Sequence, residues 1–182
     1  MLDSTPSWVA VMTYPNAEPL VAQRFEEGEP PIEHYLPKII APDKRFKDKP
    51  HHEKAMFPCY LFARINNKQI YQTRTTRGVL RIVSTQHSII QVPERDIENI
   101  RRFEASLRDI HVHETVKLVR GARTVITEGE FAGMEGTIVK GCKDGNFCVS
   151  IDVMHISIVV RLSRKELQPI KEPEPEETIS NL

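Results

Sequence analysis

The chain has 182 residues, of which 40% are hydrophobic and 27% are charged, a composition typical of a globular protein with one or two buried cores. Lys and Arg balance Asp and Glu at 25 each, so no overall positive field draws the chain onto nucleic acid. The three cysteines form no CxxC pair, and no signal segment opens the sequence. No run approaches the roughly 18 apolar residues of a membrane helix. We therefore expect a cytoplasmic protein without membrane contact.

The first half predicts alternating strands and helices. Residues 7–13 are β-branched and aromatic and predict a strand that ends at Tyr14-Pro15-Asn16. Asn16 is a candidate helix cap, and the apolar residues at 20, 21, 22 and 25 share one helix face. Residues 34–37 predict a second strand.

The basic run from 38 to 54 holds six Lys or Arg against three Asp or Glu and suits an exposed hairpin or loop. Strands are predicted over 56–65 and 78–83, and Pro93 marks the start of a helix that reaches residue 107. Residues 1–107 therefore predict an α+β domain, with an antiparallel sheet and helices packed on one face of it.

The second half predicts a small β-barrel. Residues 108–118 are polar and show no hydrophobic periodicity, which predicts a linker. Four short strands with glycine turns follow, over 123–127, 136–140, 146–153 and 156–162, and they suggest an SH3-like barrel over residues 119–170. Residues 171–182 carry four Glu against one Lys and predict a disordered acidic tail.

Nothing in the sequence favours catalysis. His111-Val112-His113-Glu114 has the residue types of a metal site, but two histidines without matching Cys or His at zinc spacing fall short of four ligands. No GxSxG and no phosphate-binding Gly-Lys-Ser/Thr motif occurs. We therefore expect no enzyme, no cofactor and no metal.

Both halves, in this order, resemble the NusG family of transcription elongation factors. The first half resembles the N-terminal NGN domain of that family, which has an RRM- or ferredoxin-like sheet. The resemblance is carried by Trp8 and Tyr14, residues 33–37, Phe57-Pro58-x-Tyr60 and Thr76-Arg77-Gly78-Val79. Residues 121–136 are similar to the family's KOW motif through Gly129, Phe131, Gly133 and Gly136. The similarity extends over residues 7–170.

The resemblance implies a mechanism. The NGN domain of the family docks on the clamp helices of RNA polymerase, holds the enzyme in its elongating state and suppresses pausing, while the KOW domain recruits a partner. Aromatic residues are favoured interface anchors. On this basis we expect polymerase contacts from Trp8, Tyr14, Phe57, Pro58, Tyr60, Thr75, Thr76 and Arg77. Simple packing in the core is the alternative for the aromatic residues, and it is the favoured interpretation for Leu61 and Phe62.

Nucleic acid is a second expected partner, as upstream DNA, non-template DNA or nascent RNA. Weak, sequence-independent phosphate contacts are expected from Lys44, Arg45, Lys47, Lys49 and Arg74, with an exposed, merely soluble hairpin or helix end as the alternative. Residues 149–156 lack the partner-binding aromatic that NusG itself carries after a Val-x-Ile strand. This departure favours a specialised, monomeric antitermination paralog of the RfaH, UpxY or LoaP kind. It argues against the usual termination factor or the ribosome as the KOW partner and leaves that partner unidentified.

A different class remains open. A protein with a KOW motif can be an RNA-binding or ribosome-associated protein, and such proteins are usually strongly basic because they neutralise many phosphates. The net charge of zero favours the transcription factor over this alternative.

Overall fold

The computed structural model describes residues 4–41, 52–86, 88–106, 110–114, 120–139, 146–151, 156–162 and 164–169. Strand β1 (Ser7–Thr13) lies at the centre of the N-terminal sheet. The strand order is β2 (Glu33–Tyr35), β5 (Tyr60–Ile65), β1 and β6 (Val79–Ile82), and β7 (Gln91–Val92) also pairs with β1. All these pairs are antiparallel. The predicted strand at 7–13 and the α+β class are confirmed.

Helices cover both faces of this sheet. On one face, Val9, Val11 and Leu61 pack with Val21 and Phe25 of α1 (Glu18–Glu27). On the other, Trp8, Ala10 and Phe62 pack with the buried side chains of α3 (Glu94–Ala105). The prediction of helices on one face is therefore wrong. Strand β1 is apolar at consecutive positions from Trp8 to Val11, so both of its faces need a cover.

Local details differ from the sequence-based expectations at two places. Asn16 does not cap α1, because it has a positive φ of 61° and Ala17 occupies the cap position without a side-chain hydrogen bond. The strand predicted over 56–65 begins only at Tyr60, after a turn in which Cys59 has φ 67°. A 3-10 turn (Asn67–Gln69), capped by Asn66, leads into the short helix α2 (Ile70–Thr75).

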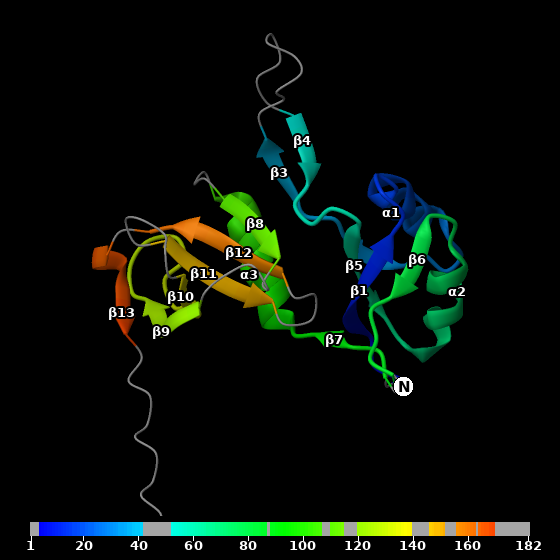
Figure 1. Ribbon diagram of the computed structural model, residues 1–182. Helices are drawn as coiled ribbons and strands as arrows, with labels where there is room; N and C mark the ends of the chain where they lie inside the picture. The colour runs from blue at the N-terminus through cyan, green and yellow to red at the C-terminus, as the bar shows by residue number, and fades with distance from the viewer. Residues whose placement is uncertain are drawn as a thin grey trace, which may run out of the picture.

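Strands β3 (Lys38–Ala41) and β4 (His52–Ala55) form a separate two-stranded hairpin with Lys38 opposite Ala55. Figure 1 shows this hairpin projecting from the molecule between the N-terminal sheet and the C-terminal strands. The basic run predicted an exposed hairpin or loop, and the two strands at the base of a hairpin are found. Residues 42–51 lie outside the described part of the chain.

Six strands form the C-terminal sheet, in the order β13 (Leu167–Pro169), β9 (Arg120–Ile126), β10 (Glu135–Val139), β11 (Asn146–Ile151), β12 (Ile156–Arg161) and β8 (Ile110–Glu114). The four predicted strands are confirmed. Residues 110–114, expected to be linker, instead pair with β12 through Val112 and Ile158. Ile110 and Val112 alternate with His111 and His113, which is the pattern of an edge strand.

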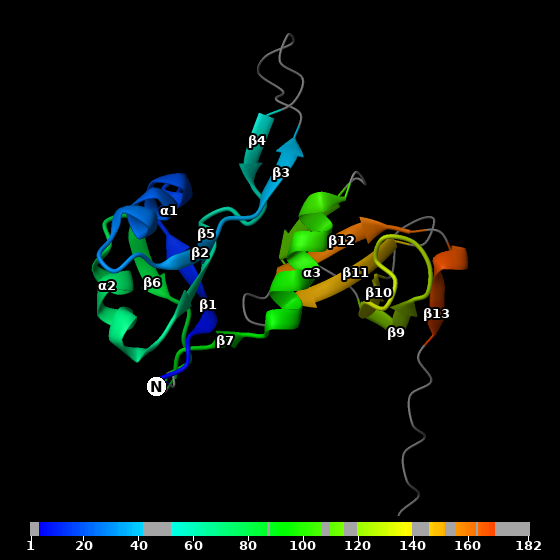
Figure 2. The same ribbon diagram turned by 180° about the vertical axis from the view of Figure 1, so that it is seen from behind.

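Helix α3 lies between the two sheets, as Figure 2 shows from behind. The 3-10 turn Arg164–Glu166 precedes β13 at the end of the described chain. Within the described residues, no helix is long and apolar enough to cross a membrane. The expected acidic tail at residues 171–182 lies outside the described residues.

Replacing Gly78 by Ala should destabilise the protein strongly. Gly78 has φ +105°, and a Cβ atom there would lie 2.7 Å from Cγ2 of Val21 on α1. Backbone strain and this clash together should lower the free energy of unfolding by about 2–4 kcal/mol. Urea denaturation followed by circular dichroism measures the change.

Gly133 supplies the matched control, since it has φ +85° but nothing within 4 Å of an added Cβ. Gly133→Ala should therefore cost only the backbone strain, about 1–2 kcal/mol. Equal losses in the two variants would contradict the importance of the contact between Gly78 and α1.

Candidate functional site

Trp8 lies in the interior between the N-terminal sheet and α3. Only 2% of its surface is exposed, and its indole Nε1 donates to the two carboxylate oxygens of Glu94 at 3.2 and 3.1 Å. The guanidinium of Arg101 lies 5.9 Å from the ring centroid, a cation–π distance. The polar edge of the indole is therefore satisfied within the fold, and its apolar body belongs to the core.

Phe57 is also buried, with 0% of its surface exposed, and meets the ring of Phe62 edge to face at 5.8 Å. Trp8 and Phe57 therefore have almost no exposed surface for the polymerase contacts expected of them, and the alternative of core packing holds for both. Helix α3 covers this sheet face, and the six-stranded C-terminal sheet, which we call the barrel, completes the same buried cluster. Both follow the aromatic strands far along the chain. The predicted burial of Phe62 and Leu61 is confirmed. The two side chains lie in separate clusters on opposite faces of the sheet.

Three segments meet at the end of the sheet where β1 finishes. The amide of Thr13 donates to the carbonyl of Cys59 at 2.8 Å, and the amide of Tyr14 donates to the carbonyl of Gly78 at 3.0 Å. Two main-chain hydrogen bonds thus bring together the turns that carry Tyr14, Pro58 and Arg77. We call this region the sheet-end surface, and its members are Met12, Tyr14, Pro58, Tyr60, Arg77, Leu80 and Arg81.

The sheet-end surface combines apolar and cationic groups. Tyr14 is 56% exposed and Leu80 is 48% exposed, while Met12 and Tyr60 face each other across β1 and β5 and are half-buried. Leu80 is the extra residue of a bulge at which Thr13 pairs with Val79 and Met12 pairs with Arg81. The exposed Arg81 donates from Nε to Sδ of Met12 at 3.5 Å, and Arg77 is exposed as well.

The predicted threonines bond mainly to their own helix. Thr75 Oγ1 donates to the carbonyl of Tyr71 at 2.9 Å, and Thr76 Oγ1 donates to that of Gln72 at 2.8 Å. These bonds close the C-terminal end of α2 and leave Thr75 exposed and Thr76 half-buried. The carbonyl of Arg77 accepts a hydrogen bond from Arg24 of α1, which fixes the turn before Gly78.

Only one of the predicted nucleic-acid-binding residues lies in the described part of the chain. Arg74 is exposed on α2 and lines a hollow of about 280 Å³ together with Ser84, Thr85, Gln86 and Ser88. Tyr71, three residues earlier, is 79% exposed, and sequence analysis did not single it out. Lys44, Arg45, Lys47 and Lys49 lie outside the described residues.

The glycine motif of the barrel contacts α3. Gly129 and Gly133 have positive φ angles of 83° and 85°, and the turn between them buries Phe131 against Phe103 at a centroid distance of 4.8 Å. Arg102 donates from Nη2 to the carbonyls of Glu130 and Ala132 at 2.8 and 3.0 Å. Gly136 lies in β10 opposite Thr124. The motif thus serves as a docking surface for the helix, a role that sequence analysis did not anticipate.

No group of three or more His, Cys, Asp or Glu side chains that could hold a metal ion occurs in the parts of the chain that the structure describes. The arrangement at the sheet end, with partly exposed aromatic and aliphatic side chains beside two arginines, is suited to contact with a macromolecule.

Cys59 offers a test of how the sheet-end surface is held. Its amide donates to the buried carboxylate of Glu18 at 2.5 Å, and its φ of 67° is a strained conformation for cysteine or alanine but not for glycine. Cys59→Gly should therefore be more stable than Cys59→Ala by about 1 kcal/mol, because both lose the thiol and only Gly removes the strain. Urea titrations of the two variants measure the difference, and a more stable Ala variant would contradict this account.

Comparison with solved structures shows a similar fold. A solved structure described as "Domain interaction in Thermotoga maritima NusG" aligns with a TM-score of 0.54 and 20% identity, covering 91% of this chain and 98% of that one. A structure described as "Crystal Structure of MjSpt4:Spt5 complex conformation A" aligns with a TM-score of 0.33 and 12% identity, covering 91% of this chain and 99% of that one. No curated protein matches the sequence.

Comparison of the sequence with models of protein families identifies the family of this chain. The family model described as "NusG: Transcription termination factor nusG" matches residues 6–101, which include the whole N-terminal sheet and most of α3. This match covers more than half of the chain, and the chain therefore belongs to the NusG family of transcription factors.

Proposed function

We propose that this protein is a transcription elongation factor that binds the clamp helices of RNA polymerase through its sheet-end surface and promotes processive elongation or antitermination. The observation that carries the proposal is the exposure of Tyr14 and Leu80 beside the half-buried Tyr60, at the one end of the sheet where three segments converge. Aromatic and apolar side chains flanked by arginine are the residue types that dominate protein interfaces.

The burial of Trp8 and Phe57 changes how these residues contribute. Both belong to the core cluster against which the half-buried Tyr60 packs. We propose that they support the binding surface from beneath and do not touch the polymerase in the arrangement described. Pro58 and Tyr60 follow Phe57 in the same turn and supply the direct contact, together with Tyr14, Arg77, Thr75 and Thr76.

The remaining roles follow the family relationship. We propose that residues 1–107 act as an NGN domain and residues 119–170 as a KOW domain that recruits a further partner. Arg74 and the basic residues at 44–49 would add weak phosphate contacts to upstream DNA, non-template DNA or nascent RNA. The protein acts without catalysis, as a cytoplasmic monomer and a specialised antitermination paralog.

Binding of the full-length protein to purified core RNA polymerase tests this assignment. Tyr60→Ala and Leu80→Ser should each weaken binding by about 2 kcal/mol, close to thirtyfold in Kd, if these side chains are anchors. Fluorescence anisotropy of a labelled chain gives the affinities, and circular dichroism checks that each variant is folded.

Leu20→Ser is the matched control for Leu80→Ser. Leu20 is also a partly exposed leucine, but it lies on α1, which covers the opposite face of the sheet. Its loss should leave the affinity unchanged. Unchanged binding by a folded Tyr60→Ala, Leu80→Ser double variant would remove the sheet-end assignment, and tight binding of the wild type to bare RNA at physiological salt would favour the RNA-binding alternative.

A further inference from the structure

The last turns of α3 touch three different parts of the molecule. Arg101 lies over the rings of Trp8 and Tyr35 at 5.9 and 5.3 Å, on the side of the N-terminal domain. Arg102, Phe103 and Ser106 contact the barrel turn between Gly129 and Gly133. Glu104 contacts the base of the β3–β4 hairpin. Consecutive residues of one helix end therefore join two domains and a projecting hairpin.

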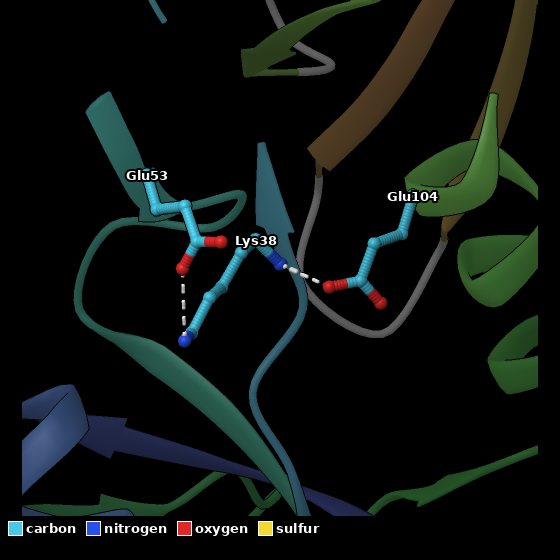
Figure 3. A network of polar contacts seen from close by, with 3 residues as sticks. All are labelled: Lys38, Glu53 and Glu104. Carbon is cyan, nitrogen blue, oxygen red and sulfur yellow. Dashed lines mark hydrogen bonds and ion pairs between the residues drawn. The ribbon is translucent and has the colours of Figure 1, made fainter. Parts of the chain in front are cut away.

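Glu104 is the polar anchor of the hairpin base. One carboxylate oxygen accepts the main-chain amide of Lys38 at 2.7 Å, and the other accepts the hydroxyl of Tyr35 at 2.5 Å. Figure 3 shows Lys38 held between Glu104, through its main chain, and Glu53 of β4, through its Nζ at 3.2 Å. Burial and the bond to Glu104 raise the pKa of Tyr35, which keeps its hydroxyl a proton donor.

The barrel holds the same helix end from the other side. Arg102 and Glu104 are two positions apart, which places them about 200° apart around the helix axis. Arg102 binds two carbonyls of the barrel turn, and Ser106 Oγ donates to Glu130 Oε1 at 2.9 Å, just beyond the last helical residue. A terminal helix turn lacks partners for its carbonyls and frays readily, so these contacts stabilise the turn that carries Glu104.

We propose that docking of the C-terminal barrel on α3 fixes the orientation of the β3–β4 hairpin, with the last turns of α3 as the shared support. When the barrel leaves, Phe103 loses its contact with Phe131, Arg102 and Ser106 lose their bonds to the barrel turn, and the helix turn that carries Glu104 loses this support. The hairpin base keeps its main-chain bond from Met56 to Pro37 and the packing of Ile39, but its bonds to Glu104 then start from a less stable helix turn. This coupling does not depend on polymerase binding.

Hydrogen exchange measured by NMR on the full-length protein tests the coupling. The readout is the exchange rate of the hairpin amides at residues 39–41 and 53–55, while the amide shifts of residues 130–133 report barrel docking. Arg102→Met removes the donors to the barrel turn and keeps the length of the side chain. It should shift the barrel-turn amides and raise hairpin exchange about fivefold or more, within the usual range of couplings between sites.

Arg95→Met is the matched control, because Arg95 lies in the first turn of α3 with a 79% exposed side chain and a 3.7 Å ion pair to Asp96. It should change neither readout. The proposal is overturned if Arg102→Met shifts the barrel-turn amides without faster hairpin exchange, if it changes neither readout, or if Arg95→Met accelerates the hairpin equally.

The reverse direction gives an independent check, since coupling between two sites is reciprocal. Glu104→Ala removes the hairpin anchor, and within the described residues the hydrogen bonds of Glu104 go to Tyr35 and Lys38 and not to the barrel. It should shift the amides of residues 130–133 in the same direction as Arg102→Met. Glu98→Ala, on the same helix and also exposed, should not. Faster hairpin exchange in Glu104→Ala with an unchanged barrel turn would contradict the coupling.

Discussion

The structure depends on one apolar cluster that continues across both halves of the chain. One cluster of buried side chains contains Trp8 and Phe62 of the sheet, the buried stripe of α3, and Phe131 and Ile158 of the barrel. A helix with an apolar stripe normally covers one surface, but Ile97, Ile100 and Phe103 are fully buried because two surfaces meet at α3. The relative placement of the two domains therefore rests on ordinary core packing, reinforced by the bonds of Arg102 to the barrel turn.

Sequence patterns located most elements because they depend on local physics. Runs of β-branched and other apolar residues predicted β1, β6 and the barrel strands, and the spacing of Ile97, Ile100 and Phe103 predicted α3. Burial could not be predicted in the same way. Whether Trp8 and Phe57 face solvent is decided by α3 and the barrel, which lie far away in the sequence, so their aromatic character alone favoured the wrong assignment.

The candidate surface was predictable in part. Tyr14, Pro58 and Arg77 were expected to act together, and the bonds of Thr13 to Cys59 and of Tyr14 to Gly78 place their segments side by side. No periodicity signals such pairings between distant turns. Leu80 was missed because it read as an ordinary strand residue, whereas the bulge opposite Met12 and Thr13 leaves it partly exposed. Tyr71 was missed because a six-residue helix has too little period to define an outer face.

Of the two tyrosines on the sheet-end surface, the half-buried Tyr60 is better suited to be an anchor than the exposed Tyr14. Binding must immobilise a free side chain at a cost of about 0.5–1.5 kcal/mol. Tyr60 packs against the cluster that contains Phe57 and Phe62 and has already lost most of that freedom in the unbound protein. The strained turn at Cys59, held by the carboxylate of Glu18, adds backbone rigidity at the adjacent residue. In the proposed binding mode, the interior aromatic residues contribute to recognition indirectly, because they hold in advance the ring that we propose as the anchor.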